Sequence, residues 1–181
     1  MPITLIGYRG SGKSSVAPAL AARLGYDWID ADVLLESRAG RTIRQIFAES
    51  GEPEFRRLER ETLQELLQRD RLVIAAGGGA ILNPDTRKEM RAAGPVVWLR
   101  ASVTLLESRI AADAVTAERR PALSSSGRDD IAQLLAAREP LYQECATVTV
   151  ATDHLTVEQV VDRVVAGLPV SEQPPSGRGP A

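Results

Sequence analysis

One segment near the start of the chain limits the folds that the chain can adopt. Residues Gly7 to Ser14 read GYRGSGKS and match the pattern G-x-x-x-x-G-K-[ST] in full. The apolar residues 3–6 before this segment predict a short buried strand, and residues 16–24 after it carry apolar side chains at helical spacing. A strand, a glycine-rich loop and a helix in this order predict a phosphate-binding loop, whose backbone N–H groups converge on phosphate oxygens at the positive end of the helix.

The residue types in this loop suit a nucleoside triphosphate with its magnesium ion. Lys13 would bridge the outer phosphates, and the hydroxyl of Ser14 would ligate Mg²⁺. Of the 22 basic residues in the chain only Lys13 and Lys88 are lysine. Because a compact ammonium fits between two phosphates in a way that a planar guanidinium does not, Lys13 is hard to interpret as an ordinary surface charge. We expect the ATP-binding cradle to comprise Gly10, Ser11, Gly12, Lys13, Ser14 and Ser15.

The rest of the chain alternates short apolar runs with amphipathic stretches, which predicts an α/β fold. We expect three layers, α/β/α, around a central parallel sheet of about five strands. A length of 181 residues is typical of one domain. We place this domain at residues 1–168, with a substrate-binding helical region at about 33–61 and a mobile lid at about 111–128. The proline-rich residues 169–181 are expected to be disordered.

Two prolines fall where helices are expected. Pro18 lies inside the helix after the glycine loop, where a proline removes a backbone hydrogen bond and crowds the preceding turn. A kink is the one accommodation that we expect there. Pro140 is expected to end the helix that carries Arg138.

Acidic residues and glycines follow two of the predicted strands. Asp30 and Asp32 come at the end of the second strand, and the carboxyl end of a parallel strand faces the ligand crevice in such sheets. One carboxylate would serve the metal shell and the other a substrate hydroxyl, although a D-x-D pair can also cap a helix. Gly77, Gly78 and Gly79 follow the third strand, and consecutive glycines favour close approach of the backbone to a ligand over a flexible connector.

Several arginines are candidates for binding anions. Arg56 and Glu59 are spaced by one helical turn, which by itself is typical of a solvated helix face with ion pairs. Arg120 lies in the predicted lid and would close over phosphates, or would be an ordinary basic residue of a surface loop. Arg138 without further context would be a helix-terminal arginine.

Composition and single residues exclude several other classes of protein. The net charge of −2 predicts no sequence-independent attraction to nucleic acid or to a membrane surface. The only cysteine, Cys145, is expected to be a buried apolar residue in a reducing compartment, and His154 is expected at the surface. No signal peptide or membrane-spanning run is evident, so we expect a cytoplasmic protein. A guanine-binding switch would need an Asn-Lys-x-Asp segment, which the chain lacks.

Taken in order, these segments resemble shikimate kinase, a P-loop enzyme of aromatic amino-acid biosynthesis. The resemblance covers roughly residues 3–168 and depends on the order and spacing of six segments. They are GYRGSGKS, Asp30-x-Asp32, the run GEPEFRRLE from Gly51 to Glu59, Gly77-Gly78-Gly79-Ala80, Arg120-Pro121, and Arg138-Glu139-Pro140-Leu141-Tyr142.

The resemblance implies a nucleoside monophosphate kinase-like fold and transfer of the γ-phosphoryl group of ATP to the 3-hydroxyl of shikimate. It implies a monomer whose partners are small molecules, with Mg²⁺ as the cofactor. By position, Asp32 would hold and help deprotonate the hydroxyl, and Asp30 would reach the Mg²⁺ through water. Arg56, oriented by Glu59, would grip the substrate carboxylate together with Arg138, and Gly77, Gly78 and Gly79 would line the ring. Lys13, Arg109 and Arg120 would contact ATP, with Arg109 near the adenine and Arg120 reaching from the lid.

Two other functions stay open at this point. A gluconate or nucleotide kinase would share the phosphate-binding loop, and gluconate also carries a carboxylate and hydroxyls. A nucleotide-operated switch or binding module would share the loop without any phosphoryl acceptor. The glycine triplet and the segment from Arg138 to Tyr142 favour shikimate as the acceptor.

Overall fold

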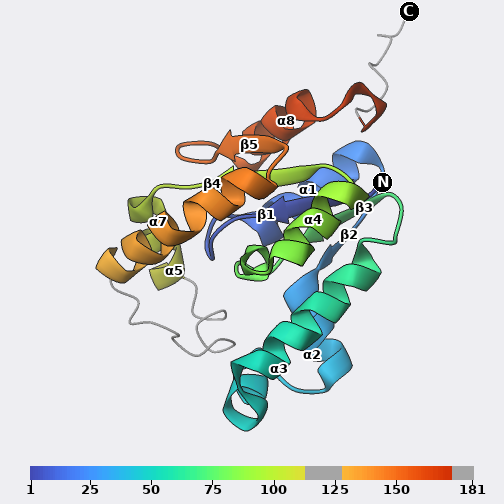
Figure 1. Cartoon of the computed structure of the whole chain (residues 1–181). Helices are drawn as coiled ribbons and strands as arrows, with labels where there is room; N and C mark the ends of the chain where they lie inside the picture. Colours follow the sequence, from blue (N-terminus) through green and yellow to red (C-terminus); the bar gives the residue numbers. More distant parts are fainter. Residues whose placement is uncertain (113–127, 173–181) are drawn as a thin grey trace, which may run out of the picture.

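A parallel five-stranded sheet forms the centre of the molecule in the computed structural model, which describes residues 1–112 and 128–172 (Figure 1). The strands lie in the order β2-β3-β1-β4-β5, and every neighbouring pair is parallel. Their bounds are β1 (Ile3–Ile6), β2 (Asp27–Asp30), β3 (Leu72–Ala75), β4 (Val96–Arg100) and β5 (Val148–Ala151). The α/β class and the parallel sheet of about five strands are therefore confirmed.

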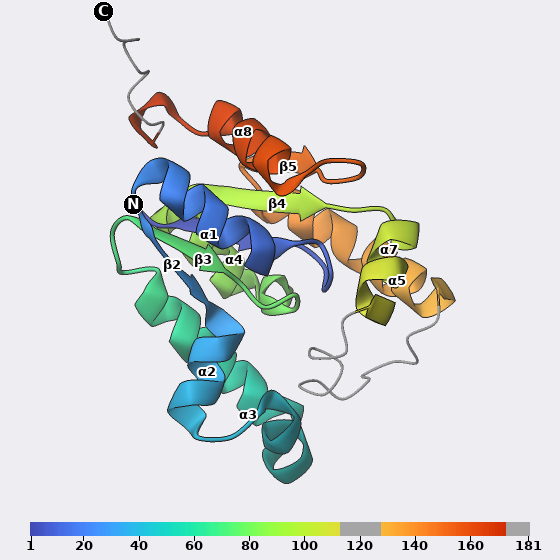
Figure 2. The same cartoon turned by 180° about the vertical axis from the view of Figure 1, so that it is seen from behind.

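Helices cover both faces of this sheet (Figures 1 and 2). On one face lie α1 and α8, and on the other lie α4 and α7, which gives the expected three layers. The elements are α1 (Lys13–Leu24), α2 (Ala31–Ala39), α3 (Ile43–Leu66), η1 (Ala80–Leu82), α4 (Pro84–Ala93), α5 (Val103–Ala112), α7 (Arg128–Cys145), α8 (Val157–Gly167) and η2 (Val170–Glu172).

The sheet separates two apolar cores. Ile3 and Leu5 of β1 point to the face under α1 and α8, where Leu20 and Val161 meet them. The alternate residue Ile6 points to the opposite core, where the side chains of α3, α4 and α7 pack. Because both faces are covered, β1 and β3 are buried along their whole length, as their continuous apolar sequences predict.

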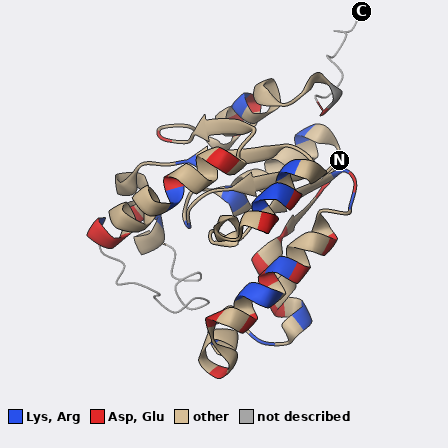
Figure 3. Ribbon diagram, in the orientation of Figure 1, with Lys and Arg blue, Asp and Glu red and all other residues tan. Residues whose placement is uncertain are grey.

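A third, smaller core lies apart from the sheet, where α2 and α3 project from it (Figure 1). Leu35 of α2 packs there on Ile43, Ile46 and Phe55 of α3. Helix α3 is kinked at Gly51, whose φ of 78° and ψ of 175° are not helical. Helix α3 therefore has two arms, and Pro53 lies near the start of the second arm. Acidic and basic residues are interspersed along α3 (Figure 3).

Pro18 and Pro140 both lie inside helices. Helix α1 continues through Pro18 because Val16, Ala17, Leu20 and Ala21 are buried against the sheet. The prediction that Pro140 ends its helix is wrong, since α7 runs on to Cys145. Tyr142 and Cys145 beyond the proline are fully buried, and that burial outweighs the roughly 3 kcal/mol cost of a proline in a helix interior.

Parts of two predictions lie outside the described residues. These are residues 113–127 of the expected lid, which include Arg120, and residues 173–181 of the expected tail. Order extends into the start of the predicted tail, because Val170–Glu172 form η2 and the hydroxyl of Tyr26 donates a hydrogen bond to Glu172. Among the residues described, no helix is both long enough and apolar enough to span a membrane.

Candidate active site

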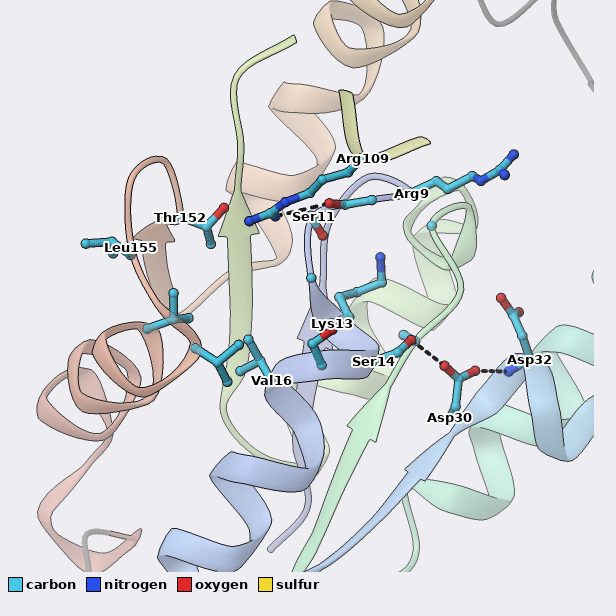
Figure 4. Close-up of a pocket in the computed structure, with 17 residues that line it drawn as sticks. Arg9, Ser11, Lys13, Ser14, Val16, Asp30, Asp32, Arg109, Thr152 and Leu155 are labelled. Carbon is cyan, nitrogen blue, oxygen red and sulfur yellow. Dashed lines mark hydrogen bonds between the residues drawn. The ribbon is translucent and has the colours of Figure 1, made fainter. Parts of the chain in front are cut away.

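A cleft of about 420 Å³ lies at the carboxyl ends of the strands, where the loops after β1, β2, β3 and β5 meet (Figure 4). This is the edge at which open parallel sheets bind ligands. Residues predicted for ATP, metal and substrate binding line this cleft. They are Gly10, Ser11, Gly12, Lys13, Ser14, Ser15, Asp30, Asp32, Gly78 and Arg109.

The start of α1 forms the floor of the phosphate site. Side chains of Asp30, Thr42, Asn83 and Thr156 cap the starts of α2, α3, α4 and α8, respectively. Helix α1 instead begins at Gly12 with no side-chain cap and no acidic residue in its first turn. Its first N–H groups are therefore available to an anion at the positive end of the helix dipole.

The ammonium of Lys13 lies inside the same loop. It donates hydrogen bonds to the carbonyl oxygens of Gly7 at 2.8 Å and Tyr8 at 3.0 Å. Figure 4 places its Nζ in the middle of the cleft, between Arg109 on one side and Asp32 on the other. The positive charge is thus fixed where a phosphate chain lying across the loop would pass.

Ser14 and Asp30 form a pair of oxygen ligands beside Lys13. The Ser14 hydroxyl donates to Asp30 Oδ2 at 2.7 Å, while Oδ1 of the same carboxylate accepts from the backbone N–H groups of Asp32 at 3.0 Å and Val33 at 3.3 Å. Asp30 therefore caps α2, as the alternative interpretation predicts, and it also faces the phosphate loop; its role in a metal shell stays a prediction. A hydroxyl and a carboxylate are hard oxygen donors that fit Mg²⁺. Within the described ranges no cluster of three or more His, Cys, Asp or Glu side chains could hold a metal unaided. This set therefore fits an ion that keeps water and phosphate ligands.

Asp32 lies in the first turn of α2, and its carboxylate points toward the cleft rather than toward Ser14 (Figure 4). The cap that Asp30 provides to the Asp32 N–H fixes the backbone from which this carboxylate projects. The two aspartates thus have different surroundings.

The glycine triplet is wedged between the phosphate loop and α3. A Cβ atom at Gly78 would lie 3.4 Å from the backbone nitrogen of Arg9 and 3.5 Å from the carbonyl oxygen of Gly7. A Cβ atom at Gly79 would lie 2.4 Å from Nη1 of Arg56, closer than atoms can approach. The close neighbours at these two positions are the phosphate loop and an arginine, and the predicted approach of the triplet to a ligand stays a prediction.

Arg56 and Arg138 reach the triplet from different helices. The guanidinium of Arg56 lies against Gly79, and its Nη1 donates to Glu59 Oε2 at 2.7 Å. Nη1 of Arg138 approaches the carbonyl oxygen of Gly78 at 3.5 Å, and its guanidinium lies over the ring of Tyr8. The fold therefore brings together two arginines that are far apart in the sequence.

The pKa of Arg56 is raised above its ordinary value. Burial acts to lower it, but the charges of Glu59 and Glu52 and their hydrogen bonds outweigh that effect. The guanidinium is therefore charged at any working pH.

The neighbouring arginines of α3 form ion pairs away from the glycine triplet. Arg57 pairs with Glu54 and Glu61 on the exposed face, and Arg60 pairs with Glu89 of α4.

The fully buried Tyr142 was not among the predicted site residues. Its hydroxyl donates to the carbonyl oxygen of Gly78 at 2.8 Å, and its ring stacks on Trp98. Tyr142 and Arg138 are four residues apart on α7, so they share one helix face and one acceptor, Gly78. Continuation of the helix through Pro140 creates this arrangement, which is why the sequence pattern could not reveal it.

The far end of the cleft is partly apolar and includes residues that the sequence analysis did not identify. Arg109 donates from Nη1 to the carbonyl oxygen of Gly10 at 3.2 Å, and Thr152, Leu155 and Val157 also line the cleft. Thr152 and Leu155 follow β5, whose carboxyl end reaches the same edge as β1. That position was the signal available in the sequence.

Two remaining predictions concern residues that are not part of the cleft lining. His154 is exposed and Cys145 is fully buried, as expected. Desolvation by burial raises the pKa of the Cys145 thiol to about 11, so it stays protonated and is a poor nucleophile.

Comparison with known proteins identifies the family. The shikimate kinase family model matches residues 9–169. A shikimate kinase of Thermobifida fusca (strain YX) is 42% identical over 167 residues, covering 92% of this chain and 94% of that protein. The solved shikimate kinase of Acinetobacter baumannii, in complex with shikimate, has a TM-score of 0.83 at 34% identity and covers 91% of this chain and 90% of that one.

A more distant neighbour bears on the alternative acceptor. A gluconokinase from Sinorhizobium meliloti has a TM-score of 0.59 at 21% identity, which shows a shared fold and no more. The matches at higher identity confirm the nucleoside monophosphate kinase-like fold and the phosphotransferase class, and they favour shikimate kinase over the gluconate-type alternative. The chain belongs to the shikimate kinase family.

Proposed function

We propose that this protein transfers the γ-phosphoryl group of ATP to the 3-hydroxyl of shikimate, giving shikimate 3-phosphate and ADP. One observation carries the proposal: the glycine triplet touches the phosphate loop through Gly78 and Arg56 through Gly79. Arg138 approaches the same triplet, and Asp32 faces the same cleft. A donor site and a site for a hydroxylated carboxylate therefore share one wall.

On the donor side, backbone N–H groups of the loop and of the first turn of α1 would cradle the phosphates, and Lys13 would neutralise their charge. Arg109 and Leu155 would enclose the adenine at the apolar end of the cleft. Ser14, with Asp30 acting through water, would hold Mg²⁺, which when bound would neutralise charge on the transferring phosphates. The uncapped start of α1 and the adjacent hydroxyl–carboxylate pair support this assignment.

On the acceptor side, Arg56 and Arg138 would grip the shikimate carboxylate with planar, charge-assisted hydrogen bonds. The backbone of Gly77, Gly78 and Gly79 would lie along the ring, which the absence of side chains permits. Asp32 would hold the 3-hydroxyl and accept its proton as the phosphoryl group arrives. Phosphoryl transfer requires positioning and charge neutralisation more than covalent chemistry, and these residues supply both.

Other parts of the proposal come from the sequence. Arg120 would reach the phosphates from the predicted lid, where it would also help to exclude water. We further propose a cytoplasmic monomer that acts in the chorismate pathway to aromatic amino acids. Light scattering on the purified protein would test the monomer.

A coupled assay of ADP release tests the acceptor. Shikimate, gluconate and nucleoside monophosphates are offered separately with ATP and Mg²⁺, and turnover is expected with shikimate alone. Turnover with gluconate or a nucleotide but not with shikimate would refute the proposal. Chelation of the metal should abolish turnover, and added Mg²⁺ should restore it.

A further inference from the structure

The guanidinium of Arg56 is held by two glutamates of α3. Glu59 Oε2 accepts from Nη1 at 2.7 Å, and Glu52 Oε1 accepts from both Nε at 3.2 Å and Nη2 at 3.1 Å. The two glutamates therefore contact different donor atoms of the guanidinium: Glu52 contacts Nε and Nη2, and Glu59 contacts Nη1.

The geometry of a guanidinium makes this division consequential. A carboxylate binds it with two parallel N–H bonds along one of two edges, Nε with Nη2 or Nη1 with Nη2. Glu52 occupies the Nε–Nη2 edge, and Glu59 holds Nη1 of the other edge. An incoming carboxylate that binds Arg56 along the Nε–Nη2 edge must therefore displace Glu52.

The two glutamates differ in how readily they can be displaced. The side chain of Glu59 is 6% exposed, whereas that of Glu52 is 53% exposed. Releasing Glu59 would leave a buried carboxylate without its arginine, which is costly. Releasing Glu52 returns its carboxylate to water.

The backbone around Glu52 also favours its release. Glu52 directly follows Gly51, whose left-handed φ of 78° breaks α3, so Glu52 stands in the first turn of the second arm of the helix. A carboxylate in the first turn of a helix is stabilised by the helix dipole whether or not it contacts an arginine. Glu52 therefore keeps part of its stabilisation after it leaves Arg56.

We infer that Glu52 is a built-in competitor for the carboxylate of the acceptor at Arg56, while Glu59 positions Arg56. This inference rests on the proposed function, because it takes the acceptor to be a carboxylate that binds Arg56. Acceptor binding is then an exchange of one carboxylate for another, and Glu52 is a specificity-determining residue. A neutral polyol cannot replace the charge of Glu52, and a carboxylate can.

Calorimetric titration of shikimate into four proteins tests the inference. The proteins are the unaltered chain, Glu52→Gln, Glu59→Gln and Glu54→Gln. Glutamine keeps the size of the side chain and removes its charge. Glu52→Gln is expected to lower the Kd for shikimate by about two- to fivefold, the range of an exposed ion pair. Glu59→Gln is expected to raise the Kd about tenfold or more, because Arg56 loses its buried partner.

Glu54→Gln is the matched control, because Glu54 lies two residues from both Glu52 and Arg56 and pairs with Arg57 on the exposed face. Its Kd should equal that of the unaltered chain, and urea unfolding should show that all four proteins are folded. A Kd for Glu52→Gln that is unchanged or raised would overturn the competitor role. If the unaltered chain does not bind shikimate at all, the proposed function fails instead, and the two failures are thereby distinguished.

Discussion

At the scale of single residues, Asp32 and Asp30 show how one backbone connection separates two roles. Asp30 is engaged by Ser14 and by the backbone N–H groups that begin α2, whereas the carboxylate of Asp32 points into the cleft. The spacing D-x-D placed both residues at the ligand edge of the sheet. It could not tell which carboxylate would be used as a helix cap, because that depends on where α2 begins.

Replacing Asp32 by asparagine tests its role in the reaction. The amide keeps the size of the side chain but cannot accept the hydroxyl proton, so kcat is expected to fall by roughly 10² or more. ATP should bind with unchanged affinity, since the proposed partner of Asp32 is the acceptor hydroxyl and not ATP. Steady-state kinetics and ATP titration give both quantities, and an unchanged kcat would contradict the role of Asp32 as the hydroxyl partner.

Adding a single methyl group at Gly79 should weaken binding of the acceptor and leave binding of ATP unchanged. A Cβ atom there would lie 2.4 Å from Nη1 of Arg56, so Gly79→Ala must displace the guanidinium. A misplacement of about 1 Å in a binding group can reduce activity by as much as 10²-fold, and we expect the KM for shikimate to rise about tenfold or more. The KM for ATP is the internal control, and a rise in both constants would indicate general distortion.

At the scale of elements, α7 shows where tertiary packing overrides a local signal. Pro140 predicts a helix end, but the burial of Tyr142 and Cys145 carries the helix onward. The opposite error occurs at α4, which the sequence analysis did not identify although Asn83 followed by Pro84 is a recognised start signal. The β-strands and α1 were predictable because their apolar patterns and the glycine loop agree with the packing that they meet.

The contacts between different helices and strands at this site could not be predicted from the sequence. The shared acceptor at Gly78 requires the register of α7 on β3, and the two glutamates on Arg56 require the kink at Gly51. Neither follows from a local pattern. The positions of Arg56 and Arg138 beside the glycine triplet were available only through the family resemblance.

Tyr142→Phe tests the contribution of α7 to the glycine triplet. It removes the hydroxyl that donates to the carbonyl of Gly78 and leaves the buried ring in place. The free energy of unfolding is expected to fall by about 1 kcal/mol, which corresponds to a Tm lower by about 2–4 °C for a domain of this size.

Tyr26→Phe is the comparison for this variant. The hydroxyl of Tyr26 bonds Glu172 where water can replace it, so a smaller loss of stability is expected. Urea unfolding of both variants supplies the values. Equal losses would mean that the bond from Tyr142 to Gly78 has no special weight.

At the scale of the whole molecule, the order β2-β3-β1-β4-β5 gathers the loops of four strands at one edge of the sheet. Occupation of the cleft should therefore stabilise the entire fold. At about a hundred times its Kd, ATP with Mg²⁺ adds about 2.7 kcal/mol to the free energy of unfolding. A rise in Tm of roughly 5–10 °C is expected for a domain of this size.

Lys13→Met is the control for this measurement. It removes the charge at the centre of the cleft, and the increase in Tm with ATP should be small or absent, measured from the variant's own baseline. Stabilisation of Lys13→Met by ATP to the same extent as the unaltered chain would contradict the assignment of the phosphate loop.

The separate core beneath α2 and α3 has a consequence for how such a protein can diversify. Leu35, Ile43, Ile46 and Phe55 stabilise this helical pair without drawing on the two cores that flank the sheet. The outer part of the pair can therefore be redesigned, or drift in evolution, while the sheet and its nucleotide loop stay intact. Replacing the segment between β2 and the middle of α3 with that of a related kinase should therefore change the substrate while the two cores that flank the sheet stay unchanged.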